Sequence, residues 1–189
     1  MLIGTIIAVV VLAIVVIWAV VQYNGLVARR NIVDESFGQI ETQLQRRFDL
    51  IPNLVATAKE YASHESKVFA AVTEARAEAG RAAASGSPEG VAKADKLLHD
   101  AAMQINAVAE AYPDLKASAN FSQLQEELAS TENKVAFSRQ AYNDSVNDYN
   151  TKRESFPSNI LAKLFKFAPR DMFSVEDPAA RKAVRVDFS

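Results

Sequence analysis

The sequence contains no cysteine, only two histidines, and six glycines and six prolines in 189 residues. Without cysteine the chain can form neither a disulfide nor a thiolate metal site, and it has no cysteine nucleophile. Neither sign of charge dominates, because 21 Lys and Arg stand against 23 Asp and Glu, which gives a net charge of −2. A chain without a basic excess is not expected to bind nucleic acid through a basic patch.

The sequence patterns of common active sites are also missing. There is no G-x-S-x-G nucleophile motif and no glycine-rich phosphate- or dinucleotide-binding motif. His64-Glu65 begins like a zinc-protease motif, but Val68 stands where the second histidine is required. A metal held by His64, His99 and a carboxylate across a hairpin is an alternative, which corresponds to a metal-dependent enzyme. The prediction is a protein that is not an enzyme, with no catalytic residues, no metal and no cofactor.

The longest stretch without charge runs from Leu2 to Val21, and Thr5 is its only polar side chain. Twenty residues in a helix span about 30 Å, the thickness of the hydrocarbon core of a bilayer. The segment must be helical there, because lipid offers no partner to backbone polar groups. It does not resemble a cleaved signal, since no basic residue precedes it and no small-residue cleavage site follows it. Residues 1–22 are therefore predicted to be a transmembrane anchor, with the lipid bilayer as a partner.

Four residues are predicted to lie at the membrane interface. Trp18 and Tyr23 stand near the end of the apolar stretch, and amphipathic rings favour that level. Arg29 and Arg30 follow, whereas no Lys or Arg precedes the span. The positive-inside rule then predicts a single-pass protein whose C-terminal domain is cytoplasmic.

Beyond the anchor, apolar residues recur at steps of three and four, which is typical of helices, and no convincing strand alternation occurs. The stripe from Leu26 to Tyr61 is close to coiled-coil spacing, and Pro52 is expected to kink or break that helix. After Pro52 the helical pattern continues toward Ala79. The predicted fold is all-α: a transmembrane helix followed by an elongated antiparallel bundle of long helices over residues 23–167, with a tail at 168–189.

Breaks in the pattern predict the helix ends. The stretch from Gly80 to Gly90 reads as the tip of a hairpin, with Ser87 capping the next helix and Pro88 opening it. Further signals are Pro113, which ends that helix, Ser118 or Asn120, which caps the last long helix, and Phe156-Pro157, which stops it.

Ser158 is expected to cap a short segment, Asn159 to Phe167, that covers the end of the bundle or else lies on an anionic membrane. The tail is expected to be extended and to dock on the bundle or on a neighbouring subunit.

The most unusual feature is polar. Arg47 stands where the stripe calls for an apolar residue, and Asn143, Asn147 and Asn150 follow one another at i, i+4 and i+7. Because a buried Arg must be paired, we predict a partly buried network that joins Arg46 or Arg47 to Asn and Asp side chains of the last long helix. Such a network would fix the register between long helices. A solvated polar face and a ligand site are the two alternatives.

Three blocks of sequence carry a family resemblance: RRFDLIPNLV (46–55), AYPDLKA (111–117) and YNDSVNDYN (142–150). With them the chain resembles the LemA family of bacterial membrane proteins. The resemblance implies a single N-terminal anchor, an elongated helical bundle and the bacterial inner (cytoplasmic) membrane, and it assigns neither catalytic residues nor a cofactor. It also singles out scaffold or interface residues, namely Arg46, Arg47, Asp49, Pro52, Asn53, Asn143 and Asn150.

The predicted function is a membrane-anchored, non-enzymatic scaffold that forms homo-oligomers or presents a surface to a membrane protein partner. Self-association is favoured by the coiled-coil-like stripe and by the Ala-rich stretch from Ala70 to Ala102, whose small side chains bury little surface. The alternative is a sensor or adaptor that regulates a membrane partner such as a protease. In that case a shift of the helices would use the kink at Pro52 and the polar network.

Overall fold

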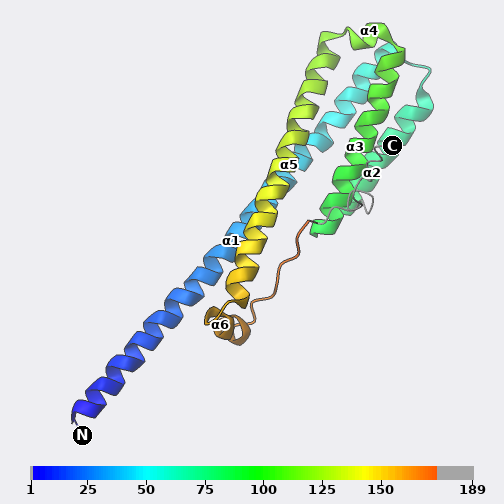
Figure 1. The fold of residues 1–189 in the computed structure, drawn as a ribbon. Helices are drawn as coiled ribbons and strands as arrows, with labels where there is room; N and C mark the ends of the chain where they lie inside the picture. The colour runs from blue at the N-terminus through cyan, green and yellow to red at the C-terminus, as the bar shows by residue number, and fades with distance from the viewer. Residues whose placement is uncertain (1, 174–189) are drawn as a thin grey trace, which may run out of the picture.

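The structure, a computed structural model, describes residues 2–173 and contains no strand in that range (Figure 1). Its helices are α1 (Leu2–Tyr61), α2 (Ser66–Ala83), α3 (Pro88–Ala111), α4 (Pro113–Lys116), α5 (Ala119–Glu154) and α6 (Ser158–Leu164). The all-α prediction is confirmed. The last sixteen residues of the predicted tail, 174–189, lie outside the described residues.

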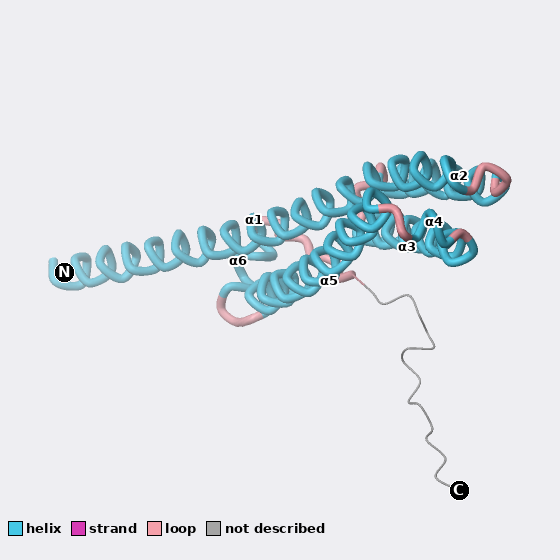
Figure 2. Tube along the Cα trace, turned by 90° about the horizontal axis from the view of Figure 1, so that it is seen from above, coloured by secondary structure: helices cyan, strands magenta, loops and turns pink. Residues whose placement is uncertain are grey.

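Helix α1 is the axis of the molecule and has 60 residues, which corresponds to about 90 Å at 1.5 Å per residue. Its first part extends alone beyond the bundle (Figures 1 and 2), and every residue from 2 to 17 is exposed. Burial on one side begins farther along, at Leu26. The exposed part is apolar and long enough to cross a membrane, so lipid rather than protein is its natural surroundings.

The helices that make up the bundle differ between its far half and the half nearer the span. In its far half, α3 and α5 both pack on α1 and meet each other through polar side chains, and α2 lies against α3 as the second arm of a hairpin (Figure 1). In the half nearer the span, α5 runs alongside α1, and α6 packs on both of them at the base. The groove between α1 and α5 is completed there by the extended chain that follows α6 and includes the buried Phe173.

The predicted hairpin and most of the predicted helix ends are confirmed. The Ser87 side chain accepts a hydrogen bond from the Gly90 N–H, and Pro88 opens α3. Ser118, not Asn120, caps α5. Ser158 does not cap α6, contrary to prediction, because it is already the first helical residue and its hydroxyl donates back to the carbonyl oxygens of Lys152 and Ser155.

The predicted break at Pro52 is wrong, because α1 continues through it to Tyr61. Proline removes the donor for the carbonyl four residues earlier, that of Phe48. Arg76 of α2 supplies a replacement, with its Nε 3.1 Å from the Phe48 carbonyl oxygen. The chain instead leaves the helix after Tyr61, over residues 62–65, where the sequence pattern had indicated continuity.

Candidate functional site

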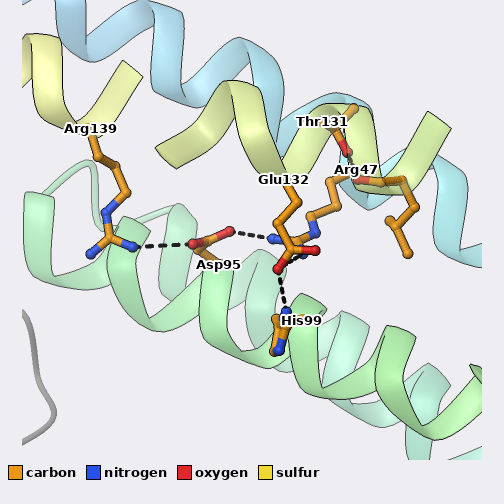
Figure 3. Close-up of polar contacts among 7 residues, drawn as sticks. Arg47, Asp95, His99, Thr131, Glu132 and Arg139 are labelled. Carbon is orange, nitrogen blue, oxygen red and sulfur yellow. Dashed lines mark hydrogen bonds and ion pairs between the residues drawn. The ribbon is translucent and has the colours of Figure 1, made fainter. Parts of the chain in front are cut away.

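A buried arginine joins three helices in the middle of the bundle (Figure 3). Arg47 of α1 is 1% exposed, and its Nη1 lies 2.6 Å from the Asp95 carboxylate of α3. Its Nη2 lies 3.3 Å from the Glu132 carboxylate of α5. One guanidinium therefore contacts a carboxylate from each of the two helices that face it.

Two further side chains extend this network. Arg139 of α5 approaches the second oxygen of Asp95 at 3.4 Å, and His99 Nδ1 of α3 lies 2.6 Å from Glu132 (Figure 3). We call these residues the Arg47 network: Arg47, Asp95, His99, Glu132 and Arg139. Apart from His99, it holds two cations and two anions, so the buried charge of Arg47 is compensated.

The network is incomplete in one respect. The Nε and Nη2 atoms of Arg47 are buried and have no hydrogen-bond partner among the described residues, although Nη2 is within ion-pair distance of Glu132. Removing a charged group from water is costly unless it is paired. The direct bond to Asp95, itself mostly buried, is therefore the best-paired contact of Arg47, and it links α1 to α3.

A buried network around Arg47 is present, as predicted, but its partners differ from the predicted Asn and Asp side chains of α5: Arg47 contacts Asp95 of α3 and Glu132 of α5. Asn150 instead binds the extended chain after α6, where its Oδ1 accepts from the Arg170 N–H at 3.1 Å and its Nδ2 donates to the carbonyl oxygen of the same residue at 2.8 Å. Asn143 does the same with Phe173, at 2.9 and 3.3 Å. Each amide thus binds both backbone groups of one residue, as a neighbouring strand would.

The spacing of the two asparagines matches the extended chain. Seven residues along a helix cover about 10.5 Å, and three residues of extended chain, from Arg170 to Phe173, cover about 10 Å. Tyr142 and Tyr149 lie beside them and donate their hydroxyls to the carbonyl oxygens of Asp171 and Ala168. Burial raises the pKa of both phenols, and nearby Arg170 opposes this by a smaller amount.

The docked chain also reaches α1. Arg170 Nη2 lies 2.6 Å from the Asp34 carboxylate, and the Phe173 ring packs against Phe37 and Tyr142. We call residues 167–173 the C-terminal strap. It lies between α1 and α5, bound to Asp34 of α1 and to Asn143 and Asn150 of α5.

The remaining candidates from the sequence lie on the surface. Arg46, Asp49, Pro52, Asn53 and Asn147 are all exposed. Asp49 accepts a hydrogen bond from Gln45 on the same helix at 2.9 Å, a local contact. The structure therefore separates the candidates into Arg47, two asparagines that hold the strap, and a group open to solvent.

The four residues predicted for the membrane interface lie at the base of the bundle. Trp18 is the first residue of α1 that is not exposed, and the Tyr23 ring meets those of Phe165 and Phe167 edge-on, with centroids 4.9 and 5.6 Å apart. Arg30 lies over the Phe167 ring, and Arg29 forms an ion pair with Asp148 of α5 at 2.8 Å.

Sequence reasoning missed Asp95, Glu132, Arg139 and Arg76. Asp95 and Glu132 each stand one position beside an inward-facing residue, Ala94 and Thr131, and such flanking charges usually lie on a solvated edge. The anomalous Arg47 signalled that a carboxylate partner existed. The position of that carboxylate depends on how three helices pack together, and the periodicity of the sequence does not contain this information.

The described residues offer little that resembles a reaction centre. One hollow, of about 280 Å³, lies between α1 and the α2–α3 hairpin and has mainly apolar walls that include Leu44, Phe48 and Leu98. Glu41 is its only titratable lining residue. Residues 2–173 contain no group of three potential metal ligands, and His99 is engaged with Glu132.

Comparison with known proteins identifies the family of this chain. The family model described as LemA family matches residues 36–188. The chain belongs to the LemA family. Similar curated proteins are magnetosome proteins MamQ 1 and MamQ 2 of Paramagnetospirillum magneticum, each 27% identical over 182 residues. Magnetosome protein MamQ of Magnetospirillum gryphiswaldense is 25% identical over 181 residues.

These alignments cover 84% of this chain and 66% of each MamQ protein, so this LemA-family chain spans just under two thirds of their length. The family and the exposed apolar start of α1 together identify a membrane-anchored protein.

Proposed function

We propose that this LemA-family protein is a non-enzymatic scaffold of the bacterial cytoplasmic membrane, which holds its bundle in the cytoplasm and associates with copies of itself. The observation that supports this most is the continuity of α1, a single helix from the apolar span to Tyr61. A helix without a flexible linker transmits the orientation of the span to the bundle. The Arg47 network and the C-terminal strap then hold α3 and α5 to that axis.

Self-association has support in the exposed apolar side chains outside the span. Ile32, Met103 and Phe137 are each more than half exposed, and Phe137 reaches 75%. Parallel anchors would place such side chains of neighbouring copies at equal heights above the membrane. Contacts between copies would bury them and add to the small core that the Ala-rich helices provide.

The mass of the full chain in lipid nanodiscs tests this part. Discs large enough for several copies should hold more than one chain at low loading, as measured by mass photometry. Replacing Phe137 with Asp should reduce that number, whereas replacing the exposed Glu74 of α2 with Gln should not. Discs that always hold a single chain would contradict self-association.

The absence of cysteine allows a direct test of orientation. Ser63, exposed in the turn between α1 and α2, is replaced by cysteine and treated with a membrane-impermeant maleimide in spheroplasts. A cytoplasmic bundle is labelled only after lysis. Labelling of intact spheroplasts would place the bundle on the other side.

A sensor or adaptor is the second candidate, and one observation favours it. Two buried donors of Arg47, Nε and Nη2, have no hydrogen-bond partner among residues 2–173, so its network has room for a second arrangement of hydrogen bonds. A partner that shifted α5 along α1 could exploit such an alternative. This candidate predicts that a membrane protein co-purifies with the wild-type chain. The amount of that protein recovered should change when the chain carries Arg47→Leu.

A further inference from the structure

Helix α6 lies at the height where the bilayer surface is expected. Its neighbour Phe165 packs against Tyr23, which is two residues, or about 3 Å, beyond the end of the charge-free stretch at Val21. Figure 1 shows α6 at the base of the bundle, on the side from which the free part of α1 projects. Headgroups, rather than bulk water, therefore surround α6 once α1 spans a membrane.

The side of α6 away from the bundle is unusually apolar for a water-exposed helix. Leu161 and Ala162 are buried on α1 and α5, yet Ile160 is 56% and Leu164 69% exposed. Ile160 and Leu164 are four residues apart and share one face. With their neighbours they form what we call the basal surface: Phe156, Ile160, Lys163, Leu164, Phe165 and Lys166.

The charge around the basal surface is opposite to that of the whole chain. Residues 150–171 contain five Lys or Arg and two Asp or Glu, a balance of +3, although the chain as a whole carries −2. Lys163 and Lys166 form no ion pair within residues 2–173, so their ammonium groups are available to an external anion. Apolar side chains interspersed with free lysines are the pattern of a helix that lies on an anionic bilayer.

A groove beside α6 adds a binding feature. It has a volume of about 440 Å³ and is lined by Arg153, Asn159, Lys163 and Lys166, together with Glu154 and the start of the strap. The Asn159 Oδ1 atom is buried and has no hydrogen-bond partner among the described residues. Lys163 and Lys166 can meet a lipid phosphate there, beside Arg153, which is held by Glu154 and by the Phe167 carbonyl oxygen. The orphaned oxygen can accept a hydrogen bond from a headgroup hydroxyl.

We propose that the basal surface is a second membrane contact, which binds the headgroups of anionic phospholipids and inserts Ile160 and Leu164 between them. The proposal rests on the anchoring of α1 and is independent of self-association. Its consequence is mechanical: α1 and α6 would hold the bundle to the bilayer at two points, so that the bundle could not tilt freely about the span.

The test uses the full chain in nanodiscs with one added cysteine carrying an environment-sensitive fluorophore. Leu164→Cys reports the basal surface, and Leu12→Cys reports the span. Phe137→Cys, a similarly exposed site on α5, is the matched control, and the discs are small enough to hold one chain, so that contacts between copies cannot shield it. Discs contain either phosphatidylcholine alone or phosphatidylcholine mixed with phosphatidylglycerol, each with a trace of lipid that carries a quencher at the headgroup level.

In mixed discs the Leu164 probe should lose most of its emission to the quencher, while the Phe137 probe should lose almost none. In phosphatidylcholine discs, and in a Lys163→Gln/Lys166→Gln variant in mixed discs, the quenching at Leu164 should fall several-fold.

Equal quenching at Leu164 in both lipids would overturn the role of anionic headgroups. Quenching no greater than that at Phe137 would overturn the contact itself. The Leu12 probe separates this failure from a failure of anchoring, because its blue-shifted emission depends only on insertion of α1.

Discussion

Arg76 on α2 donates a hydrogen bond from Nε to the backbone carbonyl oxygen of Phe48 on α1, at 3.1 Å. Pro52 stands one helical turn later and has no N–H to offer that oxygen. The same guanidinium lies over the Phe48 ring, 3.8 Å from its centroid. A side chain from the neighbouring helix thus replaces the donor that α1 lacks and keeps the helix continuous.

Replacing Arg76 with Ala should therefore lower the free energy of unfolding by about 1–3 kcal/mol, because the Phe48 carbonyl oxygen loses its partner. In a Pro52→Ala background the cost should be smaller, since residue 52 then has an N–H for that oxygen. Thermal unfolding of the full chain in detergent, followed by circular dichroism, measures both values. Arg81→Ala, an exposed change on the same helix, is the control. Equal costs in the two backgrounds would show that Arg76 does not compensate for Pro52.

The Arg47 network predicts an order of stabilities. Asp95→Ala should cost about 3–5 kcal/mol, because Arg47 keeps its buried charge and loses its direct hydrogen bond. Arg47→Leu should cost less, because it removes the buried charge and leaves Asp95 paired with Arg139. Thermal unfolding in the same detergent ranks the two variants.

The exposed pair between Lys93 and Glu78 provides a matched control for this ranking. Glu78→Ala breaks it and should change the free energy of unfolding by less than about 1 kcal/mol. If Arg47→Leu proved more damaging than Asp95→Ala, the uncompensated arginine would not be the source of the cost. The network would then stabilise the bundle through side-chain packing instead.

The strap should loosen when its asparagines are removed. Asn150→Ala deletes the acceptor of the Arg170 N–H, and Asn143→Ala deletes that of the Phe173 N–H. Losing about 1.4 kcal/mol from such a bond corresponds to about tenfold faster amide exchange. Hydrogen–deuterium exchange of a peptide covering residues 168–173 measures this. Asn147→Ala, which lies between the two sites and is exposed, should leave exchange unchanged; acceleration there would point to a general loosening of α5.

The sequence predicted features that depend on neighbouring residues: the exposed apolar start, the hairpin with its Ser87 cap, the Ser118 cap and the stop at Pro157. It also identified Arg47 as anomalous, because a single stripe suffices to see a charge at an apolar position. The continuity of α1 at Pro52 could not be predicted in the same way. It depends on Arg76, which lies 24 residues later and reaches Phe48 only once α2 has folded back.

The partners of the asparagines could not be predicted from the sequence either. Their spacing of seven residues on α5 was visible, and the expected partner was another helix. The actual partner is an extended chain, which carries no periodic signal of its own, and the match of about 10.5 Å to about 10 Å is apparent only when both conformations are known. Asn147 fitted the sequence pattern equally well, yet it points to solvent.

Alkaline pH should release the strap through Tyr149, whose hydroxyl donates to the Ala168 carbonyl oxygen at 2.8 Å. Burial raises the pKa of Tyr149, so the folded protein holds this proton more tightly than the unfolded chain does. The stabilising contribution is complete below the unfolded pKa of about 10 and is lost as the pH rises through the higher folded pKa. The wild type should therefore lose more stability between about pH 8 and pH 11 than a Tyr149→Phe variant does. The variant should start about 1 kcal/mol less stable at the lower pH, because it lacks the hydrogen bond.

Tyr61→Phe is the matched control, since that tyrosine is exposed and its hydroxyl makes no hydrogen bond within the described chain. Its unfolding curve should stay parallel to that of the wild type, and a Tyr149→Phe curve that also stayed parallel would refute the assignment.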